Sequence, residues 1–247
     1  MEKNVYRAVL IAFYLVCSFP VANGAQFEVL TSPETKCANC QHNVAAVVEN
    51  CEWLNLFNGE DLGGWHMYNS NSAVNWVVED GVLFTEGGNG DIVTDEEFEN
   101  FVLEVEWKIE KGGNSGIFYY VIENEKYKRI WETGPEFQII DENNYPVELL
   151  EKQKTGACSD VIAPSELTSN PPGEWNITRI ISKDGNVEHW LNGHLVVSYS
   201  MNSEEWKNAV QDSKFAEFDY GKIRKGRIGL QDHGNPVYYR KIRICKH

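Results

Sequence analysis

Residues 101–109 read FVLEVEWKI, and this stretch decides the fold class. An apolar residue occupies every second position from Phe101 to Ile109, and Glu104, Glu106 and Lys108 alternate with the apolar set. A period of two places the two sets on opposite faces of an extended chain, whereas a helix needs a period of about 3.6. We therefore predict a β-strand with one buried face and one face in water.

Similar short apolar stretches recur through most of the chain. They lie at residues 76–78, 82–84, 117–121, 137–140, 177–181, 187–191, 195–199, 227–230 and 237–244. Asp80-Gly81 and Asn192-Gly193 separate such stretches and predict two-residue hairpin turns, because both turn residues need a positive φ. One helix is predicted to begin at Ser203, a good capping residue, and to end near residue 215. The pattern favours an all-β jelly-roll sandwich of two antiparallel sheets with one short helix.

The composition limits the classes of partner. The chain has 247 residues, of which 42% are hydrophobic and 12% aromatic, and this excludes wholesale disorder. It carries 22 Lys and Arg against 37 Asp and Glu, a formal net charge of −15. We therefore expect no nucleic-acid partner, since binding to phosphates needs a basic surface, and no docking onto anionic lipid.

The first 24 residues have the pattern of a signal peptide. Lys3 and Arg7 precede an apolar run over residues 8–19, and the small residues of Ala22-Asn23-Gly24 precede the expected cleavage point. The run is too short to span a bilayer as a helix. We expect the protein to be exported to the periplasm or the extracellular space, with no membrane anchor.

Residues 25–52 are predicted to form a cysteine-containing extension, and residues 53–247 a single domain. Removal of the leader leaves an odd number of cysteines: Cys37, Cys40, Cys51, Cys158 and Cys245. Cys37 and Cys40 with His42 can be drawn as a zinc site or a redox pair, but export favours a disulfide. Cys158 is expected to be either a buried apolar residue or the partner of another cysteine.

Polar side chains occupy one face of the strand predicted near residues 137–140. Phe137 and Ile139 project to one side, and Glu136 and Gln138 project to the other. The apolar pair is expected in the core, so the carboxyl and the amide are expected on the outer face of their sheet.

Two further strands repeat this arrangement. Gly229, Gln231 and His233 alternate with core residues, and Asn114 stands at the start of another strand beside Ser115 and Gly116. Gly229 is expected to leave room for a ligand to approach the sheet. Amide, carboxylate and imidazole groups near many tryptophans suit a carbohydrate, because hydroxyls take hydrogen bonds and sugar rings stack on aromatic faces. An ordinary solvated sheet face is the alternative for any single residue.

Seven motifs spread over the domain resemble one family. They are LFNGEDLGGW at 56–65, NSGI at 114–117, GPEFQ at 134–138, IAP at 162–164, EWN at 174–176, HWLNG at 189–193 and GLQDHG at 229–234. Together they resemble the 3-keto-disaccharide hydrolase family, described as 3-keto-glucoside 1,2-lyases and 3-keto-2-hydroxy-glucal hydratases. The resemblance covers about residues 53–245 and implies a concanavalin A-like sandwich whose concave face holds a 3-keto-glucoside or 3-keto-disaccharide.

The implied reaction begins with a ketone at C3, which makes the C2 proton acidic. A base removes that proton, the aglycone leaves from C1, and water can add to the resulting glycal. The site must then supply a base, an acid for the leaving oxygen and donors for the enolate. From this chemistry we assign proton transfer to His233, with Glu136 as its carboxylate partner and Asp160 as a further catalytic candidate.

The remaining candidates bind substrate: Gln138, Gln231, Asn114, Trp65, His189 and Asp141. His189 shares a strand face with Val187 and Leu191, so a hydrogen-bonded core histidine is an equal alternative, and Trp65 also suits the core. The family usually has an aromatic residue where this chain has Ser159, which puts substrate preference in doubt.

No metal or cofactor is needed for this chemistry, although Asp141, Glu142 and Asp160 can be drawn as a structural calcium site. Two other classes of function remain open. A conventional glycoside hydrolase needs two carboxylates at paired spacing, and the strand holding Glu136 offers only one. A glycan-binding module of the same fold needs no catalytic groups.

Overall fold

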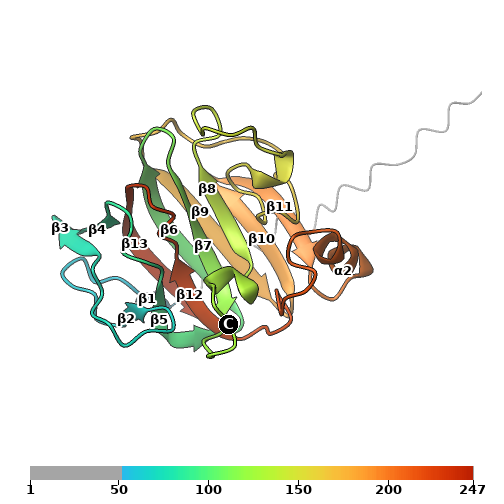
Figure 1. The fold of residues 1–247 in the computed structure, drawn as a ribbon, viewed down its shortest axis with the longest axis horizontal. Helices are drawn as coiled ribbons and strands as arrows, with labels where there is room; N and C mark the ends of the chain where they lie inside the picture. The colour runs from blue at the N-terminus through green and yellow to red at the C-terminus, as the bar shows by residue number, and fades with distance from the viewer. Residues whose placement is uncertain (1–51, 247) are drawn as a thin grey trace, which may run out of the picture.

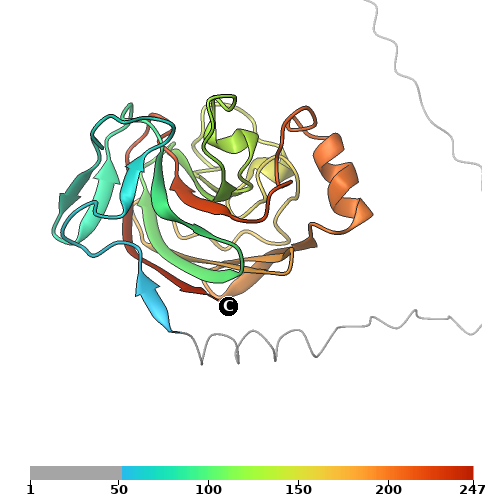
Figure 2. The same ribbon diagram turned by 90° about the horizontal axis from the view of Figure 1, so that it is seen from below.

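The computed structural model describes residues 52–246. The predicted signal peptide and nearly all of the predicted extension, including Cys37, Cys40, His42 and Cys51, lie outside the described residues. Two antiparallel sheets stack face to face (Figures 1 and 2). Among the described residues, no helix is long and apolar enough to cross a membrane.

The larger sheet has eight strands, in the order β11-β10-β9-β6-β13-β4-β3, with β1 also paired to β13. Its strands are β1 (Trp53–Asn55), β3 (Val77–Glu79), β4 (Val82–Thr85), β6 (Phe101–Ile109), β9 (Asn176–Lys183), β10 (Asn186–Leu191), β11 (His194–Ser200) and β13 (Val237–Lys246). On the outer face of β6, Glu104 and Glu106 pair with basic residues of the neighbouring strands. These pairs explain the charged residues that alternate with the apolar ones.

The smaller sheet has five strands, in the order β2-β5-β12-β7-β8. They are β2 (Trp65–Met67), β5 (Ile92–Phe98), β7 (Asn114–Val121), β8 (Glu136–Ile140) and β12 (Gly226–Leu230). Two 3-10 turns, η1 (Ile130–Glu132) and η2 (Glu151–Gln153), and the helix α2 (Glu204–Gln211) lie in the connections. Figure 2 shows that the smaller sheet is curved, with connecting segments rising around its outer side.

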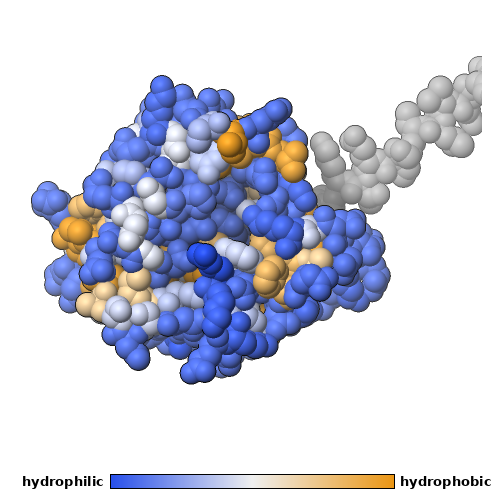
Figure 3. Space-filling view, viewed as in Figure 1, coloured by the Kyte–Doolittle hydropathy of each residue, from blue (hydrophilic) through white to orange (hydrophobic). Residues whose placement is uncertain are grey.

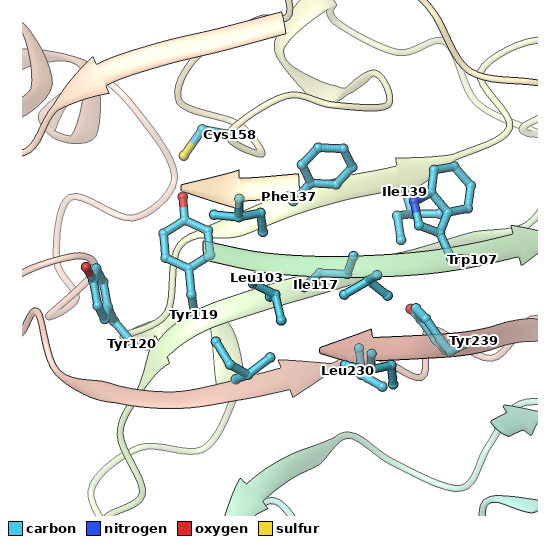
Figure 4. Packing of buried hydrophobic residues seen from close by; sticks show 14 of the residues in the cluster. Leu103, Trp107, Ile117, Tyr119, Tyr120, Phe137, Ile139, Cys158, Leu230 and Tyr239 are labelled. Atoms are coloured by element: carbon cyan, nitrogen blue, oxygen red, sulfur yellow. The ribbon is translucent and has the colours of Figure 1, made fainter. Parts of the chain in front are cut away.

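The core fills the space between the two sheets (Figure 4). Leu103, Trp107 and Tyr239 of the larger sheet face Ile117 and Phe137 of the smaller one. All five are buried, and for Leu103, Trp107 and Phe137 this is the face that the alternation of β6 and β8 assigns to the core. The predicted all-β sandwich of two antiparallel sheets with one short helix is confirmed.

The turns and the helix start follow the sequence signals. Asp80-Gly81 and Asn192-Gly193 all have positive φ, as two-residue hairpins require. The Ser203 side chain accepts a hydrogen bond from the Trp206 main-chain nitrogen at 3.1 Å, so it caps α2. The helix ends at Gln211, earlier than expected.

The strands β1, β2 and β5 were not predicted. β1 and β2 have three residues each, too few to show a period. β5 reads IVTDEEF, and three consecutive exposed residues break its alternation. Its register with β12 also shifts between Arg227 and Gly229, where the Thr94 hydroxyl accepts a hydrogen bond from the Ile228 nitrogen.

Candidate functional site

The outer face of the smaller sheet carries the polar side chains that alternate with the core. Phe137 is buried between the sheets, so Glu136 and Gln138 on β8 face the other way. Gly116 on β7 pairs with Gln138, and the Gln231 nitrogen donates to the Gly116 carbonyl at 3.0 Å. Three strands therefore bring their polar residues to one place.

A pocket of about 150 Å³ opens here. Its lining residues are Asn114, Trp131, Glu136, Gln138, Ser159, Lys214, Phe215, Gln231 and His233. Figure 3 views this side of the molecule, where hydrophilic residues predominate around the centre. Five residues predicted for the site thus meet in one pocket: Asn114, Glu136, Gln138, Gln231 and His233.

Glu136 is the buried carboxyl of the pocket, only 5% exposed. Burial raises its pKa from 4.5 to about 7, although the Lys214 cation and the nearby Ser159 hydroxyl act in the opposite direction. The carboxyl lies directly on the bare backbone of Gly116, where an added Cβ would be 2.2 Å from its Oε1 atom. A carboxyl with a pKa near neutrality can take up and release a proton at ordinary pH.

The pocket amides differ in their hydrogen bonding. Gln138 Nε2 donates to Asn114 Oδ1 at 2.9 Å, and its Oε1 accepts from the Ser159 hydroxyl at 2.7 Å. Asn114 Nδ2 in turn donates to the Tyr145 hydroxyl at 3.3 Å. Gln231 Oε1 is buried and has no partner among the described residues. A ligand that donates a hydrogen bond would satisfy it.

Asp160 contacts the pocket only indirectly, by pairing with the lining residue Lys214. It does not line the pocket; its Oδ2 atom pairs with Lys214 Nζ at 2.5 Å. Its Oδ1 atom accepts from Gln153 Nε2 at 3.0 Å, and its φ of +60° is in the left-handed region. Asp160 therefore holds Lys214, which lines the pocket itself.

His233 lies at the pocket with an exposed side chain. Its neighbour Asp232 accepts main-chain hydrogen bonds from Gly88, Asn89 and Gly90, which ties this segment to the connection between β4 and β5. His233 thus lines the pocket and is also open to water.

Four pocket residues or neighbours were missed by the sequence reasoning: Lys214, Phe215, Trp131 and Asp91. The first three belong to connections and turns, where no strand period exists to assign a face. Asp91 is the residue just before β5, and burial raises the pKa of its carboxyl to about 6. Its Oδ1 atom accepts from the Asp232 nitrogen at 3.0 Å, and its charge also raises the pKa of Glu136.

Two predicted binding residues lie in the core instead. Trp65 is buried, and its indole nitrogen donates to the Leu56 carbonyl at 2.7 Å. His189 is fully buried, with Nδ1 donating to the Gly156 carbonyl and Nε2 accepting from the Tyr119 hydroxyl. Burial lowers the His189 pKa to about 4, so the ring is neutral. Both residues pack between the sheets and cannot line the outer face.

Asp141 also lies away from the pocket. Its Oδ2 atom accepts from the Gly112 nitrogen at 2.8 Å, and its Oδ1 atom accepts from Asn144 Nδ2 at 3.2 Å. It lines a separate cavity with Glu142, whereas Asp160 pairs with Lys214. The three acids drawn as a calcium site therefore do not come together, and the described residues contain no cluster suited to a metal ion.

The space above Gly229 is already filled. A Cβ added there would be 2.4 Å from Ile130 Cδ1, because η1 lies on this part of the sheet. The expectation that Gly229 leaves room for a ligand is wrong. Cys158, in contrast, is a free buried thiol in the core, as one of the two expectations has it.

The comparisons with known proteins agree with this fold and pocket. Residues 52–245 match the 3-keto-alpha-glucoside-1,2-lyase-like domain family. The chain belongs to this family. The family identified from the seven motifs is therefore confirmed.

Named relatives and solved structures place this family member among carbohydrate-cleaving proteins. It is 32% identical to the 3-keto-disaccharide hydrolase of Bacteroides thetaiotaomicron VPI-5482, over 78% of this chain and 77% of that protein. It is 43% identical to a Parabacteroides distasonis ATCC 8503 protein provisionally assigned as a glycosyl hydrolase. That structure superposes with a TM-score of 0.76 and covers 79% of this chain and 94% of the other. These relatives support a carbohydrate-cleaving enzyme.

A more distant structure shows the fold alone. A Bacillus subtilis protein with a galectin-like fold is 13% identical and has a TM-score of 0.50, over 79% of this chain and 94% of the other. Proteins outside this family therefore share its sandwich fold.

Proposed function

We propose that this protein cleaves 3-keto-glucosides or 3-keto-disaccharides by elimination, with Glu136 as the base that removes the C2 proton. The observation that carries the proposal is the buried Glu136 carboxyl, whose pKa is raised to about 7 in a polar pocket. A carboxylate with that pKa is a much stronger base than an exposed one, yet it is partly ionised near neutral pH. The family match and the named relatives support the substrate class.

Each step has a group suited to it. Glu136 takes the proton from C2, and the electrons of the C–H bond form the enolate with the C3 ketone. The enolate then expels the aglycone oxygen from C1, which leaves a double bond between C1 and C2. His233, exposed beside the pocket, is placed to protonate the leaving oxygen and to activate water for hydration of the glycal.

The pocket composition favours this reaction over conventional glycoside hydrolysis. Retaining and inverting hydrolases need two carboxyl groups on either side of the scissile bond. Glu136 is the only carboxylic acid among the residues that line the pocket, and the nearby Asp160 carboxylate, outside the lining, is paired with Lys214. An elimination needs one base of this kind.

We also propose that the protein acts outside the cytoplasm. The charged and apolar pattern of residues 1–24 supports export. Cys245 is disulfide-bonded, which also suits an oxidising compartment.

The test compares a 3-keto-glucoside bearing a 4-nitrophenyl aglycone with the unoxidised glucoside. Release from the keto form alone is expected, with kcat/KM half-maximal near pH 7 and level from about one pH unit above that, as Glu136 ionises. Glu136→Gln should lower kcat/KM by about 10³-fold, since proton transfer contributes 10²–10⁴-fold. Release from both glucosides would point to ordinary hydrolysis, and binding without release would indicate a glycan-binding module.

A further inference from the structure

Lys214 is the only lysine or arginine among the residues that line the pocket. It comes from the segment just after α2, so neither sheet contributes it. Its ammonium group lies 5.0 Å from the centre of the Phe215 ring, another pocket wall. A cation thus stands at the edge of a pocket whose buried acid is Glu136.

Asp160 fixes the position of this cation. Surface lysines usually move freely, and their ion pairs are weak. The Lys214 side chain is itself 57% exposed, but its partner carboxylate is buried, with a side chain only 9% exposed, and Gln153 donates to the other oxygen of that carboxylate. The Asp160 nitrogen also donates to the Lys152 carbonyl at 2.8 Å.

The pocket amides are less suited than an ammonium group to a developing negative charge, because they are neutral. Gln138 uses Nε2 on Asn114 and Oε1 on Ser159. Gln231 Oε1 is a buried acceptor without a partner among the described residues, and the Gln231 amide carries no charge. An ammonium group has three N–H donors, and the single contact to Asp160 leaves donors of Lys214 for a ligand.

On the basis of the proposed elimination, we propose that Lys214 is a catalytic residue whose ammonium group stabilises the oxygen anion formed at C3, with Asp160 as its positioning residue. Removal of the C2 proton by Glu136 converts the C3 ketone into an enolate, and the negative charge collects on the C3 oxygen. When the C1–O bond breaks, the enolate electron pair forms the C1=C2 double bond, the C3 ketone re-forms, and the electrons of the C1–O bond leave with the aglycone oxygen. Lys214 keeps its proton throughout.

The same cation acts on the base. Lys214 lowers the pKa of Glu136, whereas burial and the charges of Asp91 and Asp160 raise it. Loss of the Lys214 charge should therefore move the acidic limb of the pH–rate profile to higher pH. A residue that served only to hold the local fold would not produce this shift.

The experiment separates enolate formation from aglycone release. The probe is 3-keto-1,5-anhydroglucitol, which has no aglycone, so exchange of its C2 proton in deuterium oxide reports enolisation alone. Exchange at C4, which also flanks the ketone, reports the uncatalysed background. The second probe is the 4-nitrophenyl 3-keto-glucoside. Both are measured for the wild type, Lys214→Met, Lys214→Arg and Asp160→Asn.

We expect Lys214→Met to slow C2 exchange and aglycone release together, by 10²–10³-fold, as for the loss of an oxyanion donor. Lys214→Arg should recover at least tenfold of that loss, and Asp160→Asn should fall between the wild type and Lys214→Met. The control is Lys207→Met, which removes a lysine paired with Glu204 on the exposed side of α2 and should leave both rates unchanged.

The outcomes distinguish the two proposals. If the wild type releases no aglycone from the keto-glucoside, the proposed function fails. If the wild type is active and folded Lys214→Met keeps C2 exchange within twofold, the role of Lys214 is refuted while the proposed function stands. A higher KM with unchanged kcat and exchange would also refute it, because Lys214 would then only bind the sugar.

Discussion

Gly116 determines where the Glu136 carboxyl lies. An added Cβ would come within 2.2 Å of Oε1 and 2.9 Å of both Cγ and Cδ, so the Glu136 side chain must move. Because the position of a base decides how well it reaches a proton, Gly116→Ala should lower kcat/KM by about 10²-fold on the 3-keto-glucoside. Thermal unfolding should show a stability loss of about 1–3 kcal/mol, typical of overpacking.

The control at this scale is Gly63→Ala, where the added Cβ lies no nearer than 3.1 Å to another residue's side chain and outside the pocket. It should retain wild-type kcat/KM. A folded Gly116→Ala protein with wild-type kcat/KM would show that the position of the Glu136 carboxyl does not matter for the reaction.

At the scale of elements, the Asp232 carboxylate joins the connection between β4 and β5 to the segment that carries His233. It accepts from the main-chain nitrogens of Gly88, Asn89 and Gly90 and from the Thr85 hydroxyl. Hydrogen bonds to a charged group each contribute roughly 1.5–3 kcal/mol. These four bonds share one partly exposed carboxylate, so their contributions do not add in full. Asp232→Ala should lower the free energy of unfolding in urea by about 3 kcal/mol, the upper end for one such bond, and weaken activity by freeing His233.

Hydrogen exchange locates that effect. Amides of residues 86–91 should exchange faster in Asp232→Ala, while those of β6 stay protected. The control is Asp61→Ala, because the exposed Asp61 side chain accepts from the Gly63 nitrogen at 2.9 Å only within its own loop. Unchanged exchange at residues 86–91 would mean that the loop does not depend on this carboxylate.

The strands also show how far sequence reasoning reaches. The period of two correctly placed Glu136 and Gln138 opposite Phe137, because the pleat leaves no other choice once the core face is known. It could not place Lys214, because a connection between elements has no period. Nor could it see that Ile130 fills the space over Gly229, since residues distant in sequence meet there only through the tertiary fold.

Ambiguous residue types gave the other misplacements. A histidine or tryptophan suits either a core with one hydrogen-bond partner or a sugar site, and His189 and Trp65 both proved to be core residues. Asp141 follows β8 closely, but its carboxylate turns back to the main chain of Gly112. In each case the nearest hydrogen-bond partner decided the role, and the sequence does not name that partner.

At the scale of the whole molecule, the raised pKa of Glu136 links activity to stability with opposite signs. The folded protein keeps this carboxyl protonated up to about pH 7, whereas the unfolded chain releases the proton near its ordinary pKa of 4.5. Between these values the folded state binds more protons, so its stability falls as pH rises. The ionised base that the reaction needs above pH 7 is therefore the form that destabilises the fold, by up to roughly 3 kcal/mol.

Glu136→Gln should consequently stabilise the protein above pH 7 and change little at pH 4, where the carboxyl is neutral in both states. Urea unfolding at pH 4, 6 and 8 measures the difference between variant and wild type. Glu97→Gln, an exposed position on β5, is the control and should give the same small difference at each pH. The stability gained by Glu136→Gln should grow with pH, because the wild type buries a charge once Glu136 ionises. A gain that stays constant from pH 4 to pH 8 would show that Glu136 is not a buried base that ionises in this range.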